Sequence, residues 1–120
     1  MATNLKRTGA ASKITLNVRR ERLKLDTSQV VRCQSDNNYT WLFLANGEKK
    51  FVSRTLKAFE NVLSKSGFFR VHQSHLINCT YIKQYMRESG CFIMADGSVV
   101  PVSQRKKSMV NKITKAINCQ

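Results

Sequence analysis

Five polar side chains capable of metal binding, catalysis or hydrogen bonding stand close together in residues 68–78, which read FFRVHQSHLIN. They are Arg70, His72, Gln73, Ser74 and His75, and they interrupt a stretch that would otherwise bury well as a strand. Side chains of these types can bind a metal ion, take part in catalysis, or donate hydrogen bonds to a polar partner. The rest of the sequence decides among these three kinds of chemistry.

The histidine and cysteine spacing disfavours a metal site. His72 and His75 have a spacing that suits zinc on a helix, whereas positions 72 and 75 of a single strand face opposite sides. The cysteines include no C-x-x-C pair and stand at Cys33, Cys79, Cys91 and Cys119. The chain holds only 7 acidic residues, so few other ligands remain. We therefore expect free thiols, no bound metal and no cofactor.

Catalysis is also disfavoured. Cys79 and His72 could be imagined as a nucleophile and its base, but the sequence has no G-x-S-x-G, H-E-x-x-H or phosphate-binding glycine loop. The 5 glycines lie mostly where turns are expected, which leaves little for a cofactor cradle. We therefore expect neither an enzyme nor a small-molecule substrate.

The charge of the chain favours the third kind of chemistry, contact with a polar partner. Lys and Arg number 21 against 7 Asp and Glu, which gives a formal net charge of +14 in 120 residues. A charge of this size costs the folded state self-repulsion and usually has a polyanionic partner. The basic residues are spread along the chain, so we expect a folded surface with a basic face.

Two further polar clusters resemble the first in composition. Residues 35–39 (SDNNY) form an amide-rich loop, and residues 103–107 (SQRKK) are expected to begin a C-terminal helix capped by Ser103. Cations in a first helical turn oppose the helix dipole, and a bound anion would offset that cost. An ordinary solvated basic face is the alternative interpretation of this run.

The spacing of apolar residues predicts the elements that carry these clusters. Period-two alternation or short apolar runs predict strands within 13–25, 30–33, 39–44, 49–53, 68–78, 79–86, 91–94 and 98–102. Residues 54–67 and 103–117 have helical spacing, and Asn46-Gly47 and Asp96-Gly97 are hairpin turns. Residues 39–44 are apolar at successive positions, which predicts a strand covered on both faces. The predicted fold is mainly β, with eight or nine strands in small antiparallel sheets and one internal and one C-terminal helix.

The chain reads as one domain. Residues 1–12 are expected to be a flexible N-terminal segment, and 13–120 a single domain. No apolar run reaches the length of a membrane span, and no secretory signal is present, so we expect a cytoplasmic protein.

Three stretches in this order are similar to a known family. Residues 36–51, 68–82 and 96–107 resemble the LytTR (LytR/AlgR-type) DNA-binding domain of bacterial transcription regulators, and the likeness extends over about 14–115. The central stretch is the most specific, with its aromatic pair followed by Arg70, His72, Ser74 and Asn78.

The resemblance implies a β-rich domain that reads the major groove with loops and strand ends. It implies double-stranded DNA with repeated half-sites as the partner, bound by a dimer or a pair, and the output domain of a two-component response regulator as the role. Base contacts carried over are Asn38, Gln73 and Arg105. Phosphate contacts carried over are Arg70, His72, Ser74, Ser103 and Lys106. Many relatives have a basic residue at the position of Gln73, so this residue is expected to shift the preferred base toward adenine.

An RNA-binding or ribosome-associated basic β domain is the alternative. Proteins that read RNA usually expose aromatic rings for stacking on bases. Most aromatic residues here follow apolar strand or helix patterns and are expected in the core: Trp41, Phe43, Phe51, Phe59, Phe68 and Phe92. This expectation favours duplex DNA.

Overall fold

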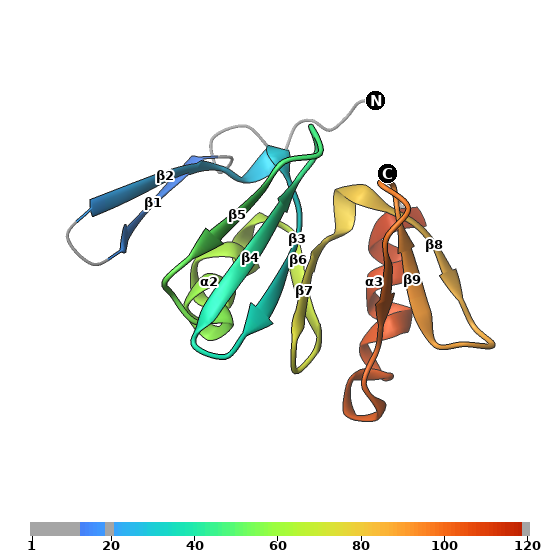
Figure 1. Cartoon of the computed structure of the whole chain (residues 1–120). Coiled ribbons are helices and arrows are strands. Elements are labelled where there is room, and N and C mark those ends of the chain that lie inside the picture. The colour runs from blue at the N-terminus through green and yellow to red at the C-terminus, as the bar shows by residue number, and fades with distance from the viewer. Residues whose placement is uncertain (1–12, 19–20, 119–120) are drawn as a thin grey trace.

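The computed structural model describes residues 13–18 and 21–118, so the expected flexible segment 1–12 lies outside the described residues. Within those ranges, ten strands form three separate antiparallel sheets (Figure 1). The predicted mainly β fold, with small antiparallel sheets, one internal helix and one C-terminal helix, is confirmed.

The strands are β1 (Lys13–Val18), β2 (Glu21–Asp26), β3 (Val30–Asp36), β4 (Tyr39–Leu44), β5 (Lys49–Val52), β6 (Phe68–His72), β7 (His75–Asn78), β8 (Ile82–Met86), β9 (Cys91–Met94) and β10 (Val99–Pro101). The helices are α2 (Leu56–Leu63) and α3 (Met109–Asn118), and the 3-10 turns are η3 (Thr27–Gln29), η4 (Ser64–Ser66), η5 (Cys79–Tyr81) and η6 (Gln104–Lys106).

The five-stranded sheet, in the order β5-β4-β3-β7-β6, is the centre of the fold. Figure 1 shows the β1–β2 hairpin extending from one side of this sheet, and β8, β9 and α3 on the other side. The strands β10-β9-β8 form the three-stranded sheet. Leu16 and Leu25, from the alternating positions predicted within 13–25, are buried against the core of the five-stranded sheet.

The first hydrophobic core lies between α2 and one face of the five-stranded sheet. The predicted helical spacing is confirmed, because Leu56, Phe59 and Leu63 are buried there. The side chain of Thr55 caps the helix by accepting a backbone hydrogen bond of 3.2 Å. After η4 the chain turns at Gly67, whose φ of +86° is a conformation that favours glycine.

The second core lies on the opposite side of the sheet, where β8–β10 and α3 pack. A register shift between Val30 and Arg32 gives β3 one extra residue opposite β4. Because successive residues of a strand face opposite sides, Val30 is buried in the first core and its neighbour Val31 in the second. The buried residues of the second core are Val31, Val71, Ile77, Phe92, Met94, Val100, Val102, Val110 and Ile113.

Asn78, at the end of β7, connects strands that belong to both cores. Its side chain is buried, and its Oδ1 accepts a hydrogen bond from the Thr80 N–H (3.0 Å). Its Nδ2 donates to the carbonyl oxygens of Val30 (2.9 Å) and Thr27 (3.4 Å). The amide therefore caps the turn after β7 and holds that turn against the start of β3.

Residues 68–78, predicted as a single strand, form a hairpin instead. β6 ends at His72, β7 begins at His75, and Gln73 and Ser74 make the turn. The two histidines are direct partners across the hairpin, with ring centroids 5.2 Å apart, so the prediction that they face opposite sides is wrong. The turn contains neither Gly nor Asn, which are the usual signals for a two-residue loop. Because this stretch contains two strands rather than one, the described residues form ten strands where eight or nine were predicted.

The prediction that β4 is covered on both faces is also wrong. Thr40 and Leu42 are buried, but Trp41 and Phe43, on the other face, are partly exposed. Phe51, opposite Trp41 on β5, is 49% exposed. Phe59, Phe68 and Phe92 are buried as expected.

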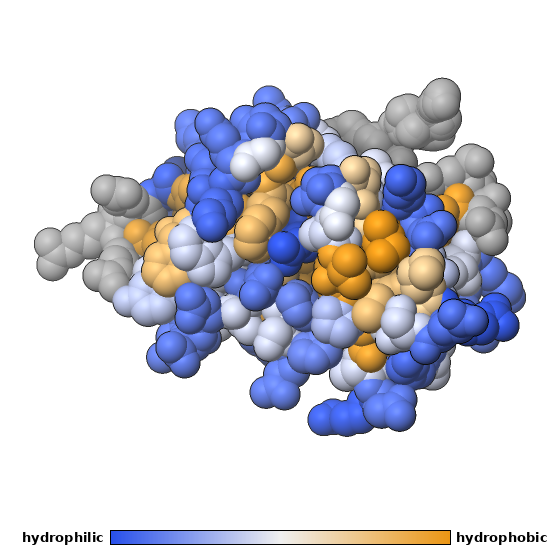
Figure 2. Space-filling model, turned by 45° about the vertical axis from the view of Figure 1, so that its right-hand side comes forward, coloured by the Kyte–Doolittle hydropathy of each residue, from blue (hydrophilic) through white to orange (hydrophobic). Residues whose placement is uncertain are grey.

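The partly exposed side of β3, β4 and β5 is called the open aromatic face below, and it consists of Arg32, Tyr39, Trp41, Phe43, Lys49 and Phe51. Cations cover part of it: the Arg32 guanidinium lies 3.9 Å from the centroid of Phe43, and Lys49 Nζ lies 4.9 Å from that of Trp41. Figure 2, turned by 45° from Figure 1, shows a surface that is mostly hydrophilic, with apolar residues exposed in several places.

Candidate nucleic-acid interface

Three turns that are far apart in the sequence lie at one end of the molecule. They are the β3–β4 turn (37–38), the β6–β7 turn (73–74) and η6, all at the lower end in Figure 1. The Ser35 N–H donates to the Ser74 carbonyl oxygen (3.0 Å), which joins the first turn to the second. The Ser103 N–H donates to the carbonyl oxygen of Val71 in β6 (2.9 Å), which joins the strand that leads into the second turn to the segment before η6. Each of the three sequence-predicted clusters therefore adjoins the next.

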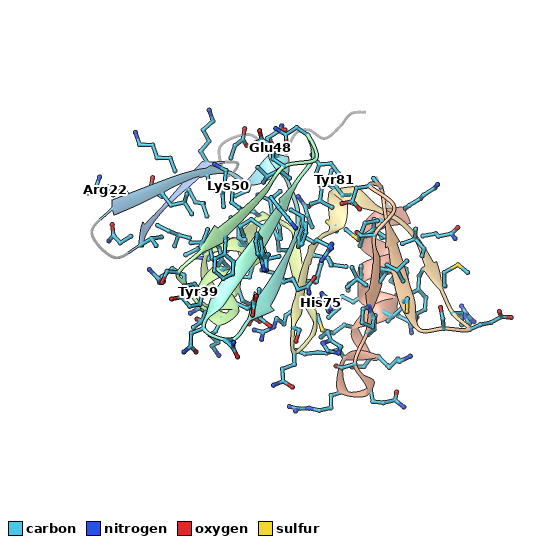
Figure 3. All side chains as sticks on the ribbon, in the orientation of Figure 1. Arg22, Tyr39, Glu48, Lys50, His75 and Tyr81 are labelled. Carbon is cyan, nitrogen blue, oxygen red and sulfur yellow. The ribbon has the colours of Figure 1, made fainter. Side chains whose placement is uncertain are left out.

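The β3–β4 turn presents Asn38 at the surface. Asn37 has a φ of +58°, a left-handed conformation that asparagine tolerates better than most residues. Asn38 is exposed. On the strand before the turn, the carboxylate of Asp36 accepts a hydrogen bond from Trp41 Nε1 (3.2 Å). Tyr39, labelled in Figure 3, begins β4 directly after the turn.

The β6–β7 turn exposes Gln73 and holds its own backbone with side chains. Arg70 Nε donates to the His72 carbonyl oxygen (3.1 Å), and Arg70 Nη2 donates to that of Gln73 (2.6 Å). Arg70 Nη1 contacts Glu60 Oε1 of α2 at 2.8 Å. Three donor groups of Arg70, a predicted phosphate contact, therefore already have protein partners.

The two histidines of this hairpin have different surroundings. His72 Nδ1 accepts a hydrogen bond from the Ser74 N–H (3.0 Å), so a neutral ring carries its proton on Nε2. His75 is half-buried, and its Nδ1 is buried without a hydrogen-bond partner. Burial, followed by the positive charges of His72 and Arg32, lowers the pKa of His75 to about 4, so this ring is neutral at pH 7. Figure 3 labels it at the lower end of the sheet.

The segment of Ser103, Arg105 and Lys106 differs from its prediction. The α-helix begins at Met109, and residues 104–106 form only the 3-10 turn η6. The Ser103 side chain makes no capping hydrogen bond, so the expected cap is wrong. The expected conflict between these cations and a helix dipole does not arise, because three residues of 3-10 helix have almost no macrodipole. Arg105 is exposed, whereas Ser103 and Lys106 are partly buried.

The turn between β8 and β9 carries Arg87, a basic residue that the sequence analysis did not single out. The Val102 N–H donates to the Gly90 carbonyl oxygen (3.0 Å), so this turn adjoins the segment before η6. Gly90 has a φ of +67°, and the ammonium group of Lys107 lies so close to it that any side chain at this position would collide with Lys107 Nζ. Arg87, in the same turn, is exposed. A lone arginine in a turn has no sequence signal, because a long-range backbone contact decides its position.

The electrostatic character of this end is basic. Among the described residues, the one ion pair joins Arg70 and Glu60. No acidic side chain of the described residues therefore forms an ion pair with Arg87, Arg105 or Lys107. Exposed cations without acidic partners suit a polyanion.

The described residues also bear on metal binding and on membrane insertion. No three His, Cys, Asp or Glu side chains of residues 13–18 and 21–118 come together as possible metal ligands. In these same ranges, no helix combines the length and apolar character needed to cross a membrane.

Comparison with known proteins assigns the fold and the family. A family model described as the LytTr DNA-binding domain matches residues 20–115. Among solved structures, the chain is similar to a LytTr DNA-binding domain from Bacillus cereus, with a TM-score of 0.68 and 26% sequence identity. That similarity covers 86% of this chain and 96% of the other.

Relatives of known name are similar over most of this chain but are longer. Sensory transduction protein LytT of Bacillus subtilis (strain 168) is 29% identical over 104 residues, which are 84% of this chain and 43% of LytT. The heme-containing CO-sensing transcriptional regulator RcoM 2 of Paraburkholderia xenovorans (strain LB400) is 28% identical over 93 residues, which are 74% of this chain and 34% of that protein. The chain thus spans less than half the length of these relatives.

Proposed function

Since the chain belongs to the LytTR family of DNA-binding domains, we propose that it binds double-stranded DNA sequence-specifically as the output domain of a bacterial response regulator. It would act in the cytoplasm, where its DNA lies. The single observation that supports the proposal most is the junction of three distant turns by the Ser35–Ser74 and Ser103–Val71 hydrogen bonds. Asn38, Gln73 and Arg105 are exposed on the joined turns.

Base contacts in the major groove come from these three side chains in the proposed mechanism. The Gln73 amide can pair with adenine through two hydrogen bonds, and the Arg105 guanidinium can pair with guanine in the same way. Each good pair of this kind discriminates against a wrong base by about 1–3 kcal/mol. Because the turns are joined to a rigid sheet, the three side chains would meet neighbouring base pairs together.

Phosphate contacts supply affinity that does not depend on sequence. The proposed donors are Lys106, Ser74, Ser103 and the Nε2–H of His72. The resemblance adds Arg70, through N–H groups that its protein partners do not use. If six phosphates are neutralised, log affinity falls with log salt at a slope of about −5. Pairs or dimers on repeated half-sites would double the number of contacts.

Selection of preferred duplexes from a random pool tests the proposal. We expect a recovered repeat whose half-sites are separated by about one helical turn. Recovery of no preferred sequence would contradict sequence-specific binding, and a single unrepeated site would contradict paired binding.

Arg105→Ala then tests the assigned contact. It is expected to weaken binding to the preferred duplex by about 5- to 150-fold, and binding to random duplex much less. Lys50→Ala is the matched control, because it removes the same charge from β5, near the upper end of the molecule in Figure 3. An equal loss on both duplexes would make Arg105 a phosphate contact instead.

RNA binding is a second candidate because of the open aromatic face. Tyr39 and Phe51 stack with ring centroids 4.9 Å apart, and Trp41 lies 4.5 Å from Phe51. Exposed aromatic rings beside cations are a surface on which unpaired bases can stack. Competition between duplex DNA and structured RNA for the protein distinguishes the two candidates, and stronger binding of the RNA would favour this one.

A further inference from the structure

The backbone of the β6–β7 turn is held by side chains at successive residues. The carbonyl oxygens of His72 and Gln73 accept from Arg70 (3.1 and 2.6 Å), and the Ser74 N–H donates to His72 Nδ1 (3.0 Å). The Ser74 carbonyl oxygen accepts from the Ser35 N–H of the neighbouring turn (3.0 Å). The turn lacks the glycine or asparagine that usually stabilises a two-residue loop, so these bonds supply its geometry.

Arg70 is itself held by Glu60, a residue of α2. Nη1 and Oε1 are 2.8 Å apart, and the side chains of Arg70 and Glu60 are 18% and 32% exposed. Hydrogen bonds between charged groups at partly buried positions are stronger and more directional than neutral ones. Phe59 and Leu63, on the same helix, are buried in the first core. A continuous series of contacts therefore runs from the core through Glu60 and Arg70 to the backbone that carries Gln73.

We propose that Arg70 is a positioning residue, which with Glu60 fixes the orientation of Gln73 and so sets base specificity, rather than a phosphate contact as the resemblance implies. This inference rests on the proposed function. A fork-shaped guanidinium is required, because Nε and Nη2 must reach two successive carbonyl oxygens while Nη1 faces a carboxylate. A lysine ammonium, a single point charge, cannot reproduce this arrangement.

The two assignments predict opposite effects for two variants. Arg70→Lys keeps the positive charge, so a phosphate contact would be retained, whereas a positioning role would be lost. Glu60→Ala removes a negative charge near a polyanion, so electrostatics alone predicts tighter binding to any DNA. If Glu60 anchors Arg70, the same variant instead loses discrimination for the preferred duplex. The sign of the Glu60→Ala effect is therefore decisive.

The experiment measures the affinity of each variant for the preferred duplex and for random duplex over a series of salt concentrations. We expect both variants to lower the ratio of the two affinities by about 5- to 150-fold, the range of one bidentate base contact. The salt slope should stay unchanged, since a lost phosphate contact would reduce it by about 0.9. Glu88→Gln is the matched control: it also removes a negative charge, from an exposed position in the β8–β9 turn, and should leave the ratio unchanged.

Two results would overturn the inference: retained discrimination in Arg70→Lys, or tighter binding of both duplexes by Glu60→Ala. A parent protein without sequence preference would contradict the proposed function instead. Hydrogen exchange of the Ser74 amide without DNA tests the positioning role in that case. Exchange should accelerate in Arg70→Lys and Glu60→Ala but not in Glu88→Gln, and equal rates in all variants would overturn the role.

Discussion

Asn78→Ala should destabilise the fold strongly, because this buried amide bonds three backbone groups that belong to Thr27, Val30 and Thr80. The truncation removes the acceptor of the Thr80 N–H (3.0 Å) and the donor to the Val30 carbonyl oxygen (2.9 Å). The carbonyl oxygen of the buried residue Val30 costs about 1–3 kcal/mol when unpaired, and the N–H of the exposed residue Thr80 adds at most about 1 kcal/mol, so we expect a loss of about 1–4 kcal/mol. Domains of this kind have total stabilities of about 5–15 kcal/mol, so the variant should still fold.

Asn78→Asp separates the two halves of this reasoning. The aspartate keeps an oxygen for the Thr80 N–H, but it places a second oxygen where Nδ2 faces the Val30 carbonyl oxygen. Burial raises the pKa of such a carboxyl, and its protonated form can donate where the charged form cannot. We therefore expect Asn78→Asp to be less stable at pH 8 than at pH 5, relative to the parent.

Urea unfolding followed by far-ultraviolet circular dichroism measures both variants. Asn111→Ala is the control, because Asn111 is exposed on α3 and its truncation should change the free energy of unfolding by less than about 0.5 kcal/mol. The reasoning is refuted if Asn78→Ala costs no more than this control. It is also refuted if Asn78→Asp has the same stability difference from the parent at both pH values.

Two other predictions concern the neighbouring surface. The parent should lose stability as the pH falls from about 6.5 to about 4, because over this interval the unfolded chain protonates His75 while the folded protein, with its lowered pKa of about 4, does not. His75→Phe removes this loss of stability, which is on the order of 1 kcal/mol after allowance for the partial exposure of the ring. Urea unfolding at pH 4.5 and 7.5 should show a smaller decrease in the free energy of unfolding for the variant than for the parent. Equal decreases would contradict the assigned cause. Phe51→Thr should cost at most about 1 kcal/mol of stability, because the ring is half exposed on an edge strand. Duplex DNA affinity should not change in this variant, and a loss as large as that of Arg105→Ala would mean that the interface extends over the open aromatic face.

Elements whose formation depends on local pattern could be predicted from the sequence. Helix α2 follows from the spacing of Leu56, Phe59 and Leu63, all of which are buried. The Asn46-Gly47 and Asp96-Gly97 turns follow from a backbone requirement, since Gly47 and Gly97 have φ values of +92° and +89°. In each case the cause lies within a few residues of the pattern.

The errors have a different cause, because each depends on a contact with a distant segment. Trp41 and Phe43 have the composition of a buried strand, but no layer packs fully over their side of β4, so their rings remain partly exposed. The turn at Gln73 is stabilised by Arg70 and by Ser35, and neither interaction can be read from the two turn residues. Helix α3 begins only at Met109, and Ser103, whose backbone N–H donates to the Val71 carbonyl oxygen, precedes the 3-10 turn η6 instead.

Convergence of the candidate base contacts follows from one strand pairing that the sequence did not predict. β7 pairs with β3 in antiparallel register, with Cys33 opposite Leu76 and Gln34 opposite His75. Since β3 runs toward the β3–β4 turn, antiparallel pairing makes β7 start at that same end, and Gln73 must then lie beside the turn that carries Asn38. A slip of this register by one residue would turn Leu76 out of the first core, so burial of apolar side chains fixes the register strongly. The hydrophobic core therefore determines the spacing of the polar groups on the surface. In the proposed function, a substitution that loosened the β3–β7 pairing would reduce discrimination among DNA sequences, although it removed no side chain that contacts a base.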